Sequence, residues 1–270
     1  MQFYFAFVFV LIHGAQSTDS AICASPDNST QYVQQGADFT AVDTKTEQTL
    51  WTFPLDAGHL TCQSSADGSV VFVANTTGYY DTASPFIFSF AARTGEVKWF
   101  TTNQSDWNGF IMFEASMSTA STLFFNIQGP AGGCDGPFAL DVQTGANKGK
   151  LDMMHGEECP SYEVSHDRST VYIGGGFVHF TSSSVYAFDL EALTKKWEFT
   201  QPTAFNLYVK SLSSDGLKLY VEGIQRQDID SARVWGTYTV DPDSGKQTGI
   251  FVPDAALNVA SQTNAFSHLI

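Results

Sequence analysis

The side chains best suited to chemistry in this sequence are aromatic rings, carboxylates and imidazoles that lie between its apolar segments. Aromatic rings offer flat apolar faces and carboxylates accept hydrogen bonds, so such a set is typical of a surface that contacts a carbohydrate or a peptide. The candidate contact residues are Tyr79, Tyr80, Asp106, Trp107, Asp135, His155, Glu157, Glu158 and His179. They are far apart in the chain, so only a fold that gathers distant loops would make them one site.

A second group of residues has the composition of a metal site without its spacing. His155, Glu157, Glu158 and Cys159 lie within five residues, whereas zinc sites normally combine two spaced pairs of ligands. The stretch from Asp241 onward begins like a calcium loop, but no glutamate follows at the twelfth position of such a loop. The nucleophile motif Gly-x-Ser-x-Gly is absent. We therefore predict no metal, no cofactor and no catalytic residues.

Composition favours a single all-β domain. The chain has 270 residues, which is enough for one substantial hydrophobic core. Aromatic residues make up 14% and charged residues only 15%, and the 22 Gly and 9 Pro allow frequent tight turns between short strands. The formal net charge of -15 would repel a phosphate backbone, so no nucleic-acid partner is predicted.

The first residues predict a secretory signal peptide. Residues 3–12 form an apolar run of ten, whereas a membrane-spanning helix needs about 20 residues. Ala15 and Ser17 supply the small residues of a cleavage site. We therefore expect a signal peptide over residues 1–17, a secreted domain over residues 18–270, and no membrane span.

Two further features agree with export. Glycosylation sequons begin at Asn28, Asn75 and Asn103, and none has Pro at its middle position. The four cysteines all follow the leader, and an even number suits an oxidising compartment. Four cysteines allow three pairings, of which Cys23 with Cys62 and Cys134 with Cys159 close the most local loops.

An internal repeat of about fifty residues organises the chain. Five segments align without a gap on a position that is usually Asp. In three of the five segments each, Thr follows at three residues, Gly at four and Trp at eight. The five marker residues are Asp43, Ala91, Asp141, Asp189 and Asp241, at spacings of 48, 50, 48 and 52 residues. Asp accepts backbone hydrogen bonds in a turn and Gly supplies a positive φ, so each segment predicts a hairpin.

A second landmark with the same period precedes four of the five markers. It is a turn, Asp-Gly in two of the four cases, followed by an apolar strand with a central aromatic residue. These aromatic residues are Phe72, Phe124, Tyr172 and Tyr220, while the first repeat shows no clear Asp-Gly turn. Each period thus holds four short strands whose sheets must stack on one another, and the Trp of the last strand can cover the neighbouring sheet. Radial stacking of such sheets predicts a β-propeller.

At these hairpins the sequence resembles the pyrroloquinoline-quinone-like, or quinoprotein alcohol dehydrogenase-like, repeat family, whose signature is Ala-x-Asp-x-x-Thr-Gly-x-x-x-Trp. The resemblance runs from about Ala37 to Phe251. That family includes quinone-dependent dehydrogenases and also non-catalytic scaffolds. The dehydrogenases carry adjacent cysteines beneath the cofactor, and this sequence has none, so no catalytic residue is carried over.

The number of blades stays open at this point. Members of the family usually have seven or eight blades, whereas five hairpins are visible here. Either a strand near residues 266–270 completes the first blade and closes a ring of five, or the ring is incomplete.

Connection lengths separate two rims of the predicted propeller. Turns within the two hairpins of each repeat are tight, whereas the connections between second and third strands and between blades are long, and they carry the candidate contact residues. Long loops on a rigid scaffold commonly hold binding groups. We therefore predict a secreted, non-catalytic scaffold that binds a protein or carbohydrate ligand on this rim. The alternatives are a quinone-dependent or otherwise loop-borne oxidoreductase or hydrolase, and a fragment without activity.

Overall fold

Four-stranded antiparallel sheets make up the computed structural model, and the described part contains five of them and no helix. The structure describes residues 21–55, 60–75, 86–102, 109–129, 134–153, 160–175, 184–202, 204–225 and 234–254. Among these residues no helix is long and apolar enough to cross a membrane. We call the sheets blades 1 to 5 in chain order.

Each blade is a meander of four consecutive strands. Blade 1 contains β1 (Ala21–Ala24), β2 (Thr30–Gln35), β3 (Asp38–Asp43) and β4 (Thr49–Pro54). Blade 2 contains β5 (Leu60–Ser64), β6 (Val70–Asn75), β7 (Phe86–Ala91) and β8 (Val97–Thr102). Blade 3 contains β9 (Phe110–Phe113), β10 (Thr122–Gln128), β11 (Cys134–Asp141) and β12 (Asn147–Lys150).

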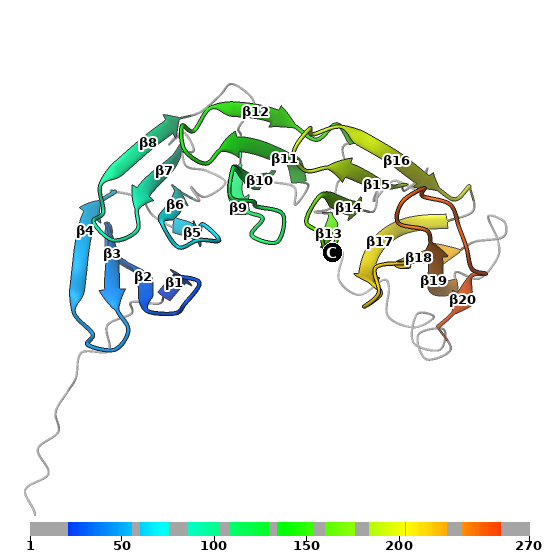
Figure 1. Cartoon of the computed structure of the whole chain (residues 1–270), viewed down its shortest axis with the longest axis horizontal. Coiled ribbons are helices and arrows are strands. Elements are labelled where there is room, and N and C mark those ends of the chain that lie inside the picture. The colour runs from blue at the N-terminus through cyan, green and yellow to red at the C-terminus, as the bar shows by residue number, and fades with distance from the viewer. Residues whose placement is uncertain are drawn as a thin grey trace, which may run out of the picture.

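The last two blades follow the same plan. Blade 4 contains β13 (Ser161–Val164), β14 (Thr170–Gly174), β15 (Ser184–Asp189) and β16 (Lys195–Thr200). Blade 5 contains β17 (Ala204–Leu212), β18 (Leu219–Gln225), β19 (Val234–Val240) and β20 (Val252–Pro253). The described blades form an open arc, with the first strand of each on the concave side and the fourth strand on the convex side (Figure 1).

In four of the five described blades, the hairpin between the first and second strands is closed by a Ser-x-Asp turn. In blade 2 the Ser65 hydroxyl donates to Asp67 Oδ1 at 2.7 Å, the amide of Ser69 donates to the same oxygen at 3.0 Å, and Gly68 has a φ of +69°. Blades 4 and 5 repeat this turn at Asp167 and Asp215.

Blade 1 also contains the turn, although its sequence shows no Asp-Gly pair. Ser25 donates to Asp27 Oδ1 at 2.7 Å, and Asn28 takes the positive φ of 57° that Gly takes in blade 2. Asn adopts this conformation more readily than other non-glycine residues. The expectation that the first repeat lacks this landmark is corrected.

The predicted hairpins between third and fourth strands are confirmed. In blade 3, Asp141 Oδ1 accepts hydrogen bonds from the amides of Gln143 at 3.0 Å and Thr144 at 2.9 Å, and Gly145 has a φ of +69°. Where the repeat departs from Gly, Glu47 and Leu193 still adopt φ values of 58° and 55°. The backbone of the turn is therefore kept without its preferred residue.

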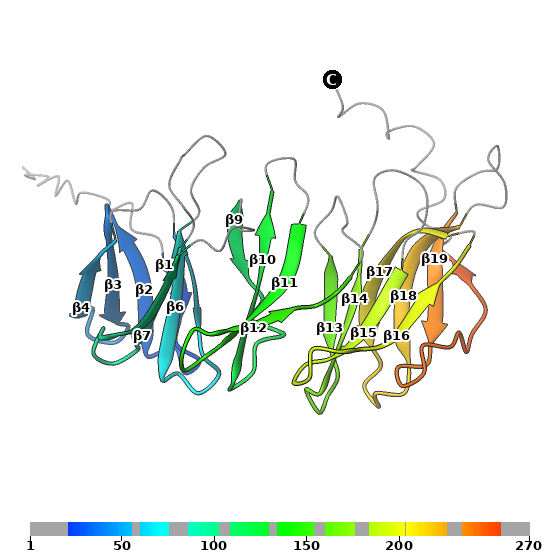
Figure 2. The same cartoon turned by 90° about the horizontal axis from the view of Figure 1, so that it is seen from above.

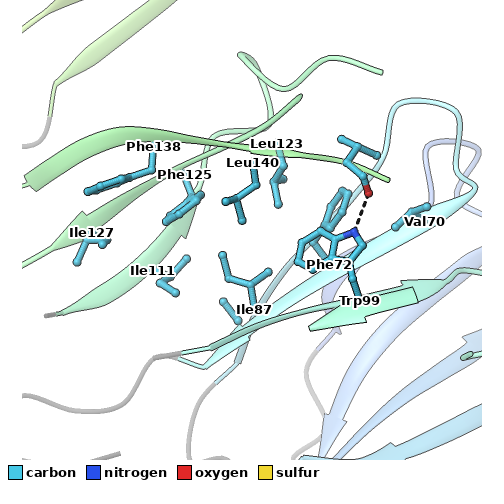
Figure 3. Packing of buried hydrophobic residues seen from close by; sticks show 12 residues of the cluster. Val70, Phe72, Ile87, Trp99, Ile111, Leu123, Phe125, Ile127, Phe138 and Leu140 are labelled. Atoms are coloured by element: carbon cyan, nitrogen blue, oxygen red, sulfur yellow. Dashed lines mark hydrogen bonds between the residues drawn. The ribbon is translucent and has the colours of Figure 1, made fainter. Parts of the chain in front are cut away.

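Tryptophan joins three of the four described pairs of adjacent blades. The Trp99 indole of blade 2 donates to the backbone carbonyl of Val142 in blade 3 at 2.8 Å. Figure 3 shows Trp99 within an apolar cluster that both blades supply. The ring packs so closely on Gly145 that a Cβ at this glycine would lie 2.7 Å from ring atoms. Trp51 and Trp197 make the same bond to the next blade, at Ala92 and Pro242.

One of the two predicted disulfides is confirmed. Cys23 of β1 is bonded to Cys62 of β5, so the bond links the inner strands of blades 1 and 2. The proposed partner of Cys134, Cys159, lies outside the described residues. Of the predicted glycosylation sites, Asn28 is exposed, whereas Asn75 is 2% exposed and its Oδ1 accepts a hydrogen bond from the amide of Phe86. Asn103 lies outside the described residues.

The two rims differ as the connection lengths predict. Both kinds of tight hairpin lie on the same rim of the arc (Figure 2). The second strands end on the opposite rim, at residues such as Asn75, Gln128 and Gln225. The described strand ends from which these long connections start therefore lie on that opposite rim.

Candidate functional site

The structure describes one of the predicted contact residues, Asp135. Tyr79, Tyr80, Asp106, Trp107, His155, Glu157, Glu158 and His179, with the leader over residues 1–17, lie outside the described residues. Asp135 is described and forms an ion pair with Lys150 across the outer part of blade 3. Its carboxylate is thus engaged within its own blade.

The junction between blades 3 and 4 departs from the tryptophan pattern. Gly149 stands at the Trp position of blade 3, and Leu193 stands at the Gly position of blade 4. A Cβ built on Gly149 would lie 3.6 Å from the Cδ1 atom of Leu193. The leucine side chain therefore occupies space that tryptophan fills at the other junctions, and the indole-to-carbonyl bond is replaced by apolar contact.

A polar cluster centred on the buried side chain of Asn126 spans the inner part of this same junction. The Asn126 side chain of β10 is 1% exposed. Its Nδ2 donates to Glu114 Oε1, just after β9, and to the Tyr162 hydroxyl of β13, both at 2.6 Å. Its Oδ1 has no hydrogen-bond partner in the described part of the chain. One amide thus holds a carboxyl group and a phenol from two blades in fixed positions.

Burial changes the acid strength of these groups. Loss of solvation raises the pKa of Glu114 from 4.5 to about 7, and the hydrogen bond from Asn126 only partly opposes it. Burial also raises the pKa of Tyr162 well above its usual range, and the nearby Glu114 charge adds to the shift. Near neutral pH the Glu114 carboxyl is therefore present both as a hydrogen-bond donor and as an acceptor.

Arg168 links the two blades beside the cluster. Its guanidinium donates to the backbone carbonyls of Ser118 at 2.7 Å and Ser116 at 3.3 Å, in the turn that follows Glu114. The bond crosses from the tight turn of blade 4 to that of blade 3. It holds together a junction that lacks the tryptophan bond.

The arrangement suits hydrogen bonding to a polar ligand. Glu114 and Tyr162 are partly exposed, and β9 and β13 lie on the concave side of the arc (Figure 1). In a propeller the first strands of the blades line the central channel, so side chains on these strands can reach a ligand near the axis. The described residues hold no group of three or more His, Cys, Asp or Glu side chains arranged to bind a metal.

Comparison with known proteins identifies the architecture. No family model and no curated protein matches the sequence. Among solved structures, the Dos1 propeller superposes with a TM-score of 0.56 at 15% identity, covering 87% of this chain and 58% of that one. The chain has a β-propeller fold. An oligogalacturonate lyase from Vibrio parahaemolyticus gives 0.52 at 18% identity, covering 83% of this propeller and 63% of the lyase.

These likenesses show the fold alone, because their sequence identities are 15 and 18%. This propeller also spans less than two thirds of either solved chain, at 58 and 63%. Its ligand must therefore be argued from its own residues.

Sequence reasoning missed Glu114, Asn126 and Tyr162. The available signal was Asn126, which is the single amide within the apolar run from Leu123 to Ile127 of the predicted strand. A buried amide in a strand requires partners. Its partners lie 12 and 36 residues away in the sequence, so only the stacking of blades reveals them.

Proposed function

We propose that this propeller is a secreted, non-catalytic scaffold that binds a protein or carbohydrate ligand on the concave side, where blades 3 and 4 meet beneath the rim with long connections. The observation that carries this proposal is the Glu114–Asn126–Tyr162 cluster. It places a carboxyl group, an amide and a phenol in the one described junction that lacks the tryptophan bond. Burying polar groups costs free energy, and departures from an apolar core are often found at functional sites.

The geometry of the cluster supports ligand binding. Asn126 holds both partners by bonds of 2.6 Å, so the carboxyl and the phenol are preorganised donors and acceptors. Hydroxyl groups of a sugar or backbone amides of a peptide can form hydrogen bonds with both the carboxyl group and the phenol. The predicted contact residues of the long connections, Trp107 and Tyr80 among them, would extend this surface by stacking.

Secretion and the type of repeat belong to the same proposal. The disulfide between Cys23 and Cys62 fits an oxidising compartment, as does the predicted leader over residues 1–17. The Asp-turn hairpins with their interblade tryptophans support assignment to the pyrroloquinoline-quinone-like repeat type. The intact mass of protein secreted from eukaryotic cells tests the leader, because cleavage removes residues 1–17.

The binding proposal is tested on a glycan array and with an extracellular peptide library. We expect saturable binding that is lost in Glu114→Gln and Tyr162→Phe and weakened in Trp107→Ala. Glu163→Gln is the matched control, since Glu163 follows Tyr162 on β13 and is directed away from the cluster by strand alternation. Binding that survives both cluster substitutions would place the site elsewhere and contradict the proposal.

A further inference from the structure

A cavity of about 420 Å³ lies on the tight-turn rim between blades 1 and 2. It is remote from the polar cluster, and its volume lies within the range of about 300–1,000 Å³ found for ligand pockets. Asp27, Thr30 and Leu50 line it from blade 1, and Asp67 and Arg93 line it from blade 2. The repeats allow it to be compared with the equivalent places in other blades.

In blades 3 and 4 a lysine of the same chain occupies the equivalent place. It is the residue directly before the Trp position, in the β-bulge of the third and fourth strands. Lys148 Nζ donates to Thr122 Oγ1 at 2.7 Å, and Lys196 Nζ donates to Thr170 Oγ1 at 2.7 Å. Two blades thus place an ammonium group on the first threonine of the second strand.

Blade 1 has the threonine that accepts the hydrogen bond in blades 3 and 4, but it lacks the lysine that donates it. Its second strand begins with Thr30, which corresponds to Thr122 and Thr170, and the bulge residue before Trp51 is Leu50. Leucine has no donor, so Thr30 Oγ1 receives no ammonium group from its own blade. Leu50 is 47% exposed and lines the cavity. The cavity is therefore the space that a lysine side chain fills elsewhere in the fold.

The charges on the walls suit a cation. A hydrogen bond from Ser25 is the largest cause that lowers the pKa of Asp27 to about 2, and one from Ser65 does the same for Asp67. Both carboxylates are therefore ionised at physiological pH. In blade 4 the pKa of Asp167, the counterpart of Asp27, is lowered chiefly by Ser165 and further by the charge of Lys196. Arg93 is the one cation among the residues that line the cavity.

We propose that this cavity binds a lysine side chain of a partner polypeptide, whose ammonium group takes the place at Thr30 that Lys196 takes at Thr170. The alkyl stem of the ligand packs on the exposed Leu50 side chain, while the compact ammonium group reaches the hydroxyl and the neighbouring carboxylates. The net charge of -15 attracts a basic partner to this surface. The inference does not depend on the proposed function, because the proposed binding site lies between blades 3 and 4 and this cavity lies between blades 1 and 2.

The test is an NMR titration with Nα-acetyl-lysine N-methylamide, followed at the backbone amides of Thr30 and Gly68. We expect saturable shifts in the millimolar range with this probe and none with the norleucine analogue, which has the stem without the charge. Equal shifts with both probes, or none with either, would overturn the proposal.

Three variants locate the effect. Leu50→Lys should fill the cavity from within and abolish the shifts, whereas the control Leu50→Met should keep them. Lys196→Leu should empty the equivalent place in blade 4 and add a second set of shifts at Thr170 and Gly216. Retained binding in Leu50→Lys, or no new shifts in Lys196→Leu when its circular dichroism matches the parent, would contradict the assignment.

Discussion

Two neighbouring junctions, between blades 2 and 3 and between blades 3 and 4, join adjacent sheets through different side chains. At the first, Trp99 lies over Gly145 and donates to Val142. At the second, Gly149 faces Leu193, and Asn126 connects the blades through Glu114 and Tyr162. The first junction is a general device of this fold, because Trp51 and Trp197 repeat it. The second is specific to one place and therefore is the better candidate for a function.

The comparison also explains a pairing of residue types. Each tryptophan packs on a glycine of the next blade, as Trp51 does on Gly95 and Trp197 on Gly245. Where the tryptophan becomes Gly149, the glycine becomes Leu193 in spite of its positive φ of 55°. The side chain of Leu193 thus fills space left by the missing tryptophan at Gly149, because protein interiors are close-packed.

The largest effect is expected from Trp99→Ala. Trp99 is 8% exposed, and truncation removes both the apolar contact with Phe72 and the bond to Val142. Urea unfolding should show a loss of about 3–5 kcal/mol. The exposed neighbour substitution Lys98→Ala should change stability by less than about 0.5 kcal/mol. A loss below 1 kcal/mol for Trp99→Ala would show that this junction does not depend on its tryptophan.

The Glu114 carboxyl should make the other junction sensitive to pH. Its pKa is raised from 4.5 to about 7, so the folded state keeps a proton that the unfolded state has lost. Stability should therefore fall as pH rises from about 4.5 to 7, by up to roughly 3 kcal/mol. Glu114→Gln should abolish this dependence in urea titrations at pH 5 and pH 8. An unchanged slope in the variant would assign the effect to another group.

Alanine at the two equivalent turn positions should give contrasting results. Gly145→Ala places a Cβ 2.7 Å from ring atoms of Trp99 at a φ of +69° and should cost about 1–3 kcal/mol. Leu193→Ala removes a half-buried side chain at a position with no tryptophan above it. It should cost about 1 kcal/mol, and it should not shift the fluorescence of Trp99. Similar losses together with equal fluorescence changes would refute the junction-specific account.

Acid should weaken the tight-turn rim in several blades at once. The pKa values of Asp27, Asp67 and Asp167 are lowered to about 2, chiefly by hydrogen bonds from Ser25, Ser65 and Ser165. A lowered pKa stabilises the fold above the unfolded value of 3.8 and loses this contribution as pH falls toward 2. Ser65→Ala should move the acid transition to higher pH. An identical transition in wild type and variant would exclude these turns as its origin.

The smallest effect is expected from Asn28→Gly. Asn28 has a φ of 57°, and Gly68 takes the corresponding place in blade 2. Thermal unfolding should change by a few tenths of a kcal/mol at most in the unglycosylated protein. The substitution removes a sequon, so mass spectrometry of secreted protein should show the loss of one glycan if this predicted site is used. A large loss of stability would contradict the equivalence of the two turns.

Local features of the fold were predictable because they depend on residues close in sequence. Asp141 reaches amides two and three residues away, and the following Gly145 supplies the positive φ. Blade 1 escaped recognition because Asp27-Asn28 replaces Asp-Gly. The sequence also suggested the bond between Cys23 and Cys62, because this pairing closes a local loop between cysteines 39 residues apart.

The amino-acid sequence alone thus determined the hairpins, their period and the need to stack them. Only the tertiary structure decided which residues come together between blades. Asn126 bonds to Tyr162 across 36 residues, and Leu50 lines one cavity with the turn at Asp67. The physical reason is that hairpin geometry is encoded by short-range hydrogen bonds and φ preferences. Contacts between blades depend instead on how whole sheets pack, and every side chain at the junction contributes to that.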